Sequence, residues 1–240
     1  MLKKSLLCSL FFANILFASG SEVNVYSQRH YDSDKALFKK FEEKTGIKVN
    51  LITAKAEELV SRLSIEGANS PSDILITADI GNLYEAKERD LLQGVSSKTL
   101  EKNIPAHLRD EGGKWFAITK RARLFVYNPK TINPAHLDDY FSLTKPEFKG
   151  KVITRSSTNA YNKSLLASII AHHGEEKSLE FVKGLVNNFA RDPKGADKDQ
   201  IRAVASGEAD IAIVNSYYLG VMANSGDKVD EEIAKEVKVF

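Results

Sequence analysis

The chain has 240 residues and a formal net charge of +2, and 42% of its residues are apolar. This length and apolar content are enough for a packed core in one large domain or two lobes. This composition excludes a disordered chain, and the near-neutral charge indicates neither a nucleic acid nor a membrane surface as partner. The single cysteine, Cys8, lies in the first twenty residues, so disulfides, thiol catalysis and sulfur-ligated metals are excluded from the rest of the chain.

Residues 1–20 have the layout of a secretory signal, with Lys3 and Lys4 before an apolar run and small residues after it. We expect cleavage after Gly20, which takes the formal charge from +2 to 0 because residues 1–20 contain no Asp or Glu. The run is shorter than the roughly 20 residues that span a bilayer. Because a large exported chain without disulfides fits a bacterial periplasm, we expect the mature chain in the periplasm. We also expect it to be a monomer with no membrane insertion.

The first half of the mature chain alternates short apolar runs with amphipathic helical patterns. The first predicted helix begins at Asp32 or Ser33 and ends at Gly46, and the second turns Leu59 and Leu63 inward. This alternation is typical of an α/β fold built from crossover units. The strands are predicted at residues 23–27, 48–53 and 73–77.

Residues 115–127 hold two short β-like runs around the basic residues Lys120, Arg121 and Arg123, a pattern that indicates a chain crossing between two lobes. The final run, residues 236–240, resembles the start of a strand returning to the N-terminal lobe, so we expect the chain to be truncated there. The predicted lobes are residues 21–122 and 123–235. In the second lobe we predict strands at 152–154 and 211–214, helices at 162–173 and 175–188, and a helix ended by Gly207.

Motifs for the common enzyme classes are missing from the sequence. It contains no dinucleotide-binding glycine motif after a strand, no phosphate-binding Walker loop and no nucleophile elbow. His172 and His173 stand at a predicted helix C-terminus, where polar side chains are favoured without any metal. No nucleophile with an adjacent base can be placed, so we predict that the protein is not an enzyme.

Four of the eight tyrosines follow strands that should end at a ligand-binding edge. Tyr217 and Tyr218 come directly after strand 211–214, in the first turn of a helix that Asn215 or Ser216 would cap. His30 and Tyr31 lie between the first strand and helix, and Tyr161 precedes a helix of the second lobe. In open α/β sheets, ligands bind outside the carboxyl ends of strands.

Phenolate is a hard anionic donor that suits Fe(III). Because the pKa of free tyrosine is about 10, only a strongly charged metal deprotonates several tyrosines at neutral pH. Fe(III) with four phenolates and a neutral imidazole carries a net charge of minus one. A guanidinium from Arg121 or Arg123 could neutralise that charge.

These segments resemble the periplasmic ferric-iron-binding proteins of bacterial ABC importers, within the type II periplasmic binding protein fold. The resemblance covers the mature chain, from EVNVYSQRHYDSD through GKWFAITKRARLFVYN and RSSTNAYNKSLLAS to ADIAIVNSYYLG. It implies two α/β lobes that close over one Fe(III) and delivery of the iron to an inner-membrane ABC permease. The implied metal ligands are His30, Tyr31, Tyr161, Tyr217 and Tyr218.

Other branches of the family use a carboxylate after the third strand together with an anion such as carbonate. Here that stretch reads ITADIGN, with Asp79 but no Glu, so we favour iron binding by protein ligands alone. An anion held by Arg121 or Arg123 remains open. The alternative is a binding protein of the same fold for a small anion or organic solute, for which the residues to examine are Arg155, Ser156, Ser157 and Thr158.

Overall fold

The computed structural model describes residues 21–240, so the predicted signal at 1–20 lies outside the described residues. The chain divides into two compact units, which we call the first and second units. The first ends at Ala78 and the second is Asp79–Phe240. The lobe boundary between residues 122 and 123 stays a prediction.

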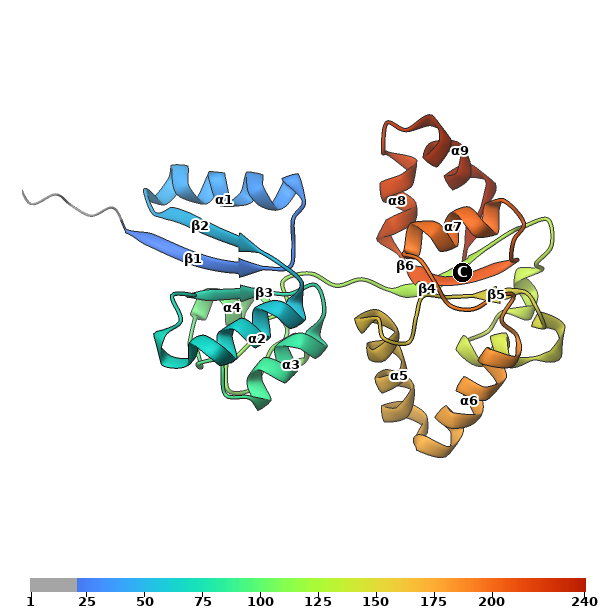
Figure 1. The fold of residues 1–240 in the computed structure, drawn as a ribbon, viewed down its shortest axis with the longest axis horizontal. Coiled ribbons are helices and arrows are strands. Elements are labelled where there is room, and N and C mark those ends of the chain that lie inside the picture. Colours follow the sequence, from blue (N-terminus) through green and yellow to red (C-terminus); the bar gives the residue numbers. More distant parts are fainter. Residues whose placement is uncertain (1–20) are drawn as a thin grey trace, which may run out of the picture. The chain divides into compact units, whose positions relative to one another are not determined.

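The first unit is a three-stranded parallel sheet in the order β2-β1-β3. Helices α1 and α2 flank this sheet from opposite sides (Figure 1). The predicted strands and helices are all present, and Leu59 and Leu63 of α2 are buried as expected. The elements are β1 (Glu22–Ser27), α1 (Asp32–Thr45), β2 (Lys48–Thr53), α2 (Ala56–Glu66) and β3 (Ile74–Ile76).

The second unit is built on a mixed sheet in the order β5-β6-β4-β7, in which β5 and β6 are parallel and β4 is antiparallel to both β6 and β7. Its strands are β4 (Arg123–Tyr127), β5 (Val152–Ile153), β6 (Ile211–Asn215) and β7 (Lys238–Val239). Its helices are α3 (Ile80–Glu88), α4 (Lys98–Asn103), α5 (Ala160–His173), α6 (Glu175–Asn187), α7 (Asp197–Ala205), α8 (Tyr217–Ala223) and α9 (Lys228–Glu236).

Alternate residues of β4 and β6 feed two separate hydrophobic clusters, because successive side chains of a strand point to opposite faces. Phe125 and Ile213 pack with Phe181 on the face covered by α5 and α6. Val126 and Val214 belong to the cluster of α7, α8 and α9 on the other face (Figure 1). With both faces covered, β6 is buried along its whole length, so the loop that follows it starts from a fixed point.

One detail differs from the sequence expectations. The run at residues 115–118 forms no strand; Phe116 makes a single bridge to Arg109, so β4 is the only strand formed in residues 115–127. The final apolar run does form a strand, β7, which pairs with β4. Its return to the N-terminal lobe stays a prediction.

Candidate functional site

Two neighbouring parallel strands carry the tyrosines of the second unit. Ile153 of β5 is paired with Ala212 of β6, so the loops after both strands leave from the same edge of the sheet. The loop after β5 leads into α5, where the Asn159 side chain accepts a hydrogen bond from the Tyr161 N–H at 3.0 Å. Helix α8 begins at Tyr217, immediately after β6. Tyr161, Tyr217 and Tyr218 therefore all lie in first helical turns.

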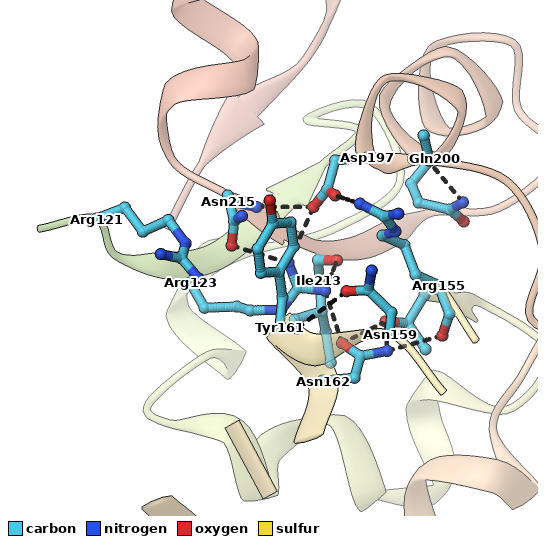
Figure 2. Close-up of polar contacts among 12 residues, drawn as sticks. Arg121, Arg123, Arg155, Asn159, Tyr161, Asn162, Asp197, Gln200, Ile213 and Asn215 are labelled. Carbon is cyan, nitrogen blue, oxygen red and sulfur yellow. Dashed lines mark hydrogen bonds and ion pairs between the residues drawn. The ribbon is translucent and has the colours of Figure 1, made fainter. Parts of the chain in front are cut away.

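The side chains of these three tyrosines converge. The rings of Tyr217 and Tyr218 have centroids 4.3 Å apart. Burial raises the pKa of Tyr217 well above its ordinary value, and hydrogen bonds with the side chains of Tyr218 and Tyr161 raise that pKa further. The three phenols therefore lie close together, and the raised pKa favours the protonated form of Tyr217 in the absence of a strongly charged ion. Figure 2 shows Tyr161 among its polar neighbours.

Three guanidinium groups surround the ring of Tyr161 (Figure 2). The Cζ atoms of Arg121, Arg155 and Arg123 lie 4.5, 5.4 and 5.9 Å from the ring centroid. A cation within about 6 Å of an aromatic face is attracted to it. Among the four candidate tyrosine ligands, Tyr161 thus has the most arginines beside its ring. They include Arg121 and Arg123, the two arginines named from the sequence.

A buried carboxylate, that of Asp197 at the start of α7, holds two of these arginines. Its oxygens accept from Arg123 Nη1 at 2.9 Å and from Arg155 Nη1 at 2.6 Å. It also accepts from the backbone N–H of Asn215 at 2.9 Å. Asp197 is fully buried and Arg123 is nearly so, with side-chain exposures of 0% and 8%. Asp197 therefore ties the end of β6 to the arginines around Tyr161.

Arg123 joins the two tyrosine-bearing loops directly. It donates to the side-chain oxygens of Asn162, at 2.6 Å, and Asn215, at 3.0 Å. Asn162 is the neighbour of Tyr161, and Asn215 stands two residues before Tyr217. Burial lowers the pKa of Arg123, which the charge and hydrogen bond of Asp197 oppose. In this structure Arg123 acts as a buried strut between the loops.

Arg121 has a different partner, Asp79. The Arg121 Nη2 atom donates to Asp79 Oδ2 at 2.6 Å, while the Ser164 hydroxyl of α5 donates to Asp79 Oδ1 at 2.6 Å. Asp79 also caps α3 by accepting from the Gly81 N–H. A carboxylate that is already engaged by a guanidinium, a hydroxyl and a helix N-terminus acts as an anchor for Arg121 in this structure.

The remaining predicted ligands, His30 and Tyr31, belong to the first unit, in the loop between β1 and α1. Both are exposed, and their rings are stacked with centroids 5.0 Å apart. Arg29, whose Nη2 lies 2.8 Å from Asp34 Oδ1, places its guanidinium 5.6 Å from the Tyr31 ring centroid. This loop repeats the arrangement around Tyr161: a tyrosine, an arginine beside its ring and an aspartate that holds the arginine.

Among residues 21–240, no group of three or more His, Cys, Asp or Glu side chains could hold a metal ion. The sequence interpretation of His172 and His173 as structural agrees with their contacts: His172 Nδ1 lies 2.7 Å from the Ser168 carbonyl oxygen, and His173 packs edge-on against Phe141.

Residues 69–237 match the family described as bacterial extracellular solute-binding protein. The chain belongs to this family. This solute-binding protein is 53% identical to the ferric binding protein from Campylobacter jejuni, whose structure it matches with a TM-score of 0.86 over 90% of this chain and 69% of that one. It matches the Trichodesmium protein IdiA (FutA), solved in complex with iron and citrate ligands, with 46% identity and a TM-score of 0.87 over 92% and 70% of the two chains.

Iron uptake protein A1 of Synechocystis is 50% identical over 219 residues, which are 91% of this chain and 61% of that protein. The solute-binding protein thus spans about 61% of the length of this curated relative. The structural matches confirm the predicted type II periplasmic binding protein fold. The relatives are named for iron uptake or ferric binding, not for catalysis, in line with the prediction that the protein is not an enzyme. Over residues 21–240, no helix is long and apolar enough to cross a membrane.

Proposed function

We propose that this protein captures Fe(III) as a transport cargo in the periplasm, through the phenolates of Tyr31, Tyr161, Tyr217 and Tyr218 with His30 as a further ligand, and delivers it to an inner-membrane ABC permease. The observation that carries the proposal is that the phenols of Tyr161, Tyr217 and Tyr218 lie close together. The names of its relatives, which include ferric-binding proteins and an iron uptake protein, support the same cargo.

The charges near Tyr161 fit this cargo. Fe(III) with four phenolates and a neutral imidazole carries a net charge of minus one, from +3 and four negative charges. Three arginines surround Tyr161, and the two aspartates that hold them are Asp79 and Asp197. Three positive and two negative charges leave +1, which offsets the charge of the ferric complex without an added anion. The charge count therefore favours binding by protein ligands alone.

The raised pKa of Tyr217 supports selection of a trivalent ion. A buried phenol gives up its proton only to an ion whose charge outweighs both the burial and the neighbouring phenols. Fe(III) meets this condition better than Fe(II), because metal binding must release one proton for each phenolate formed. We therefore expect the protein to bind Fe(III) much more tightly than Fe(II).

The proposal is tested by adding a ferric chelate to iron-free protein and recording the visible spectrum. We expect a red or purple phenolate-to-iron charge-transfer band, weakened or shifted in Tyr217→Phe and Tyr218→Phe, together with a lower iron affinity. Tyr84→Phe is the matched control, because Tyr84 is 57% exposed on α3. If Tyr217→Phe and Tyr218→Phe kept the colour and affinity of the native protein, the tyrosine assignment would be wrong.

The three guanidinium groups also favour a second candidate, a binding protein for a small anion. Such a protein would bind carbonate, phosphate or citrate in the absence of iron, and Tyr217→Phe would leave that affinity unchanged. Titrating iron-free protein with each anion, and then titrating iron with and without carbonate, separates the two functions. Binding of iron that requires carbonate would instead indicate a synergistic anion held by Arg121 or Arg123.

A further inference from the structure

A cavity in the second unit is lined by none of the candidate iron ligands. Its volume is about 580 Å³, and it lies between α5, α6 and the segments that follow β5 and α6. This volume is within the range of roughly 300–1,000 Å³ found for small-molecule sites. The cavity is therefore large enough for a small organic ligand.

Most of the wall is apolar. Phe181, Leu185 and Ile213 belong to the buried core, with exposures of 3%, 9% and 1%, and they also line the cavity. Leu166 of α5 and Val186 of α6 line it nearer the surface, and Val186 is 54% exposed. An apolar wall with an exposed side chain such as that of Val186 favours a ligand with a hydrocarbon or aromatic body.

Among the polar side chains of the lining, Arg155, Ser156 and Ser157 come from the segment after β5. The Nη1 atom of Arg155 donates a hydrogen bond to Asp197 Oδ2, but its Nε atom is buried without a hydrogen-bond partner among the described residues. A buried donor without a partner carries a free-energy cost that an acceptor in the cavity would remove. Arg155 is therefore the group to which a ligand head would bind.

Arg191, the other arginine of the lining, is already engaged. Its Nε atom lies 2.7 Å from Glu208 Oε1, and its Nη2 atom donates to Gln200 Oε1 at 3.2 Å. Arg155 and Arg191 are thus each paired with a carboxylate that lies outside the lining, that of Asp197 for Arg155 and that of Glu208 for Arg191. Arg155 Nε, by contrast, has neither a hydrogen bond nor an ion pair among the described residues, and a carboxylate head is favoured there because it accepts charge-assisted hydrogen bonds.

We propose that this cavity binds a small amphipathic monocarboxylate, with its carboxylate accepting from Arg155 and Ser156 and its apolar chain against Phe181, Leu166 and Val186. It is a second ligand site, separate from the tyrosine group, although Arg155 contributes to both. The site does not depend on iron, so it stands or falls independently of the ferric function.

Decanoate is the probe, titrated calorimetrically into iron-free protein, with 1-decanol as the uncharged probe of equal chain length. We expect saturable binding of one decanoate per chain with a Kd below about 1 mM. 1-Decanol should bind about tenfold or more weakly, because it lacks the charge-assisted hydrogen bond to Arg155. Absence of saturable decanoate binding would overturn the site, and equal affinity for decanol would overturn the anionic head.

Val186→Trp fills the cavity and should weaken decanoate binding at least about tenfold. Val229→Trp is the matched control, an equally large change at a position on α9 that is 64% exposed and outside the lining; its affinity should equal that of the native protein. Amide chemical shifts in the native protein should change at Leu165, Phe181 and Phe189 on addition of decanoate. Native affinity in Val186→Trp, or shift changes confined to other residues, would refute the assignment.

Discussion

Asp197→Asn is the substitution that most directly tests how the candidate site is held together. The native carboxylate is fully buried and accepts three hydrogen bonds, two of them from guanidinium groups. Asparagine has nearly the same shape, but it leaves Arg123 and Arg155 without their anionic partner. Removing one member of a buried ion pair costs roughly 3–5 kcal/mol. Because the amide oxygen can keep one of the contacts, we expect the lower end of this range, about 3 kcal/mol.

For a folded unit of this size, each kcal/mol corresponds to roughly 2–4 °C in Tm, so the melting temperature should fall by about 6–12 °C. The free energy of unfolding is measured by urea titration, and the Tm by calorimetry. Asp138→Asn is the control: its side chain is 78% exposed and lies 3.5 Å from Lys145 Nζ, so it should cost less than about 0.5 kcal/mol. The loss in Asp197→Asn should persist at high salt, because buried pairs are poorly screened. Equal stability of the two variants would refute the strut role of this network.

Three further predictions concern stability. Gly184→Ala should destabilise the protein by about 1–3 kcal/mol, since the new Cβ would come within 2.6 Å of Thr144 Cβ. Gly220→Ala on α8 should stabilise it by about 0.5–1 kcal/mol, because the new Cβ meets nothing within 4 Å. Urea titrations that ranked the two variants in the opposite order would contradict this packing. The hydrogen bond from Lys87 lowers the pKa of Asp110, so its contribution is complete above its unfolded pKa of about 3.9 and is lost as the pH falls through the lower folded value. Asp110→Asn should therefore show a shallower loss of stability below about pH 4 than the native protein, and parallel acid limbs would argue against it.

Local patterns were sufficient to predict most of the fold. The strand at 48–53 and the helix ending before Gly46 lie where their periodicity and stop residue indicate, and Leu59 and Leu63 are buried. The β-like pattern of residues 115–118 suggested a strand that does not form, because an apolar pattern alone does not supply a neighbouring strand. Only Phe116 makes a bridge, to Arg109. A strand needs a neighbour that the local sequence does not reveal.

The sequence was sufficient to predict the tyrosines of the candidate site but not the buried aspartate, Asp197, that holds the arginines beside them. Tyr161, Tyr217 and Tyr218 could be placed together because strand ends share an edge of the sheet. Asp197 gave no such signal: it reads as an ordinary helix-start residue, and its partner Arg123 lies 74 residues away in the sequence. Its importance depends on complete burial, which follows from tertiary packing.

The pairing of Val152 with Ile211 and of Ile153 with Ala212 has a consequence for how this protein can change. The spacing of the turns that carry the tyrosines is set by the backbone pairing of β5 with β6. Nearby side chains can therefore vary without altering that spacing. An insertion or deletion of one residue in either strand would rotate every later side chain to the opposite face. The grouping of the phenols thus tolerates changes of residue type far better than changes of chain length.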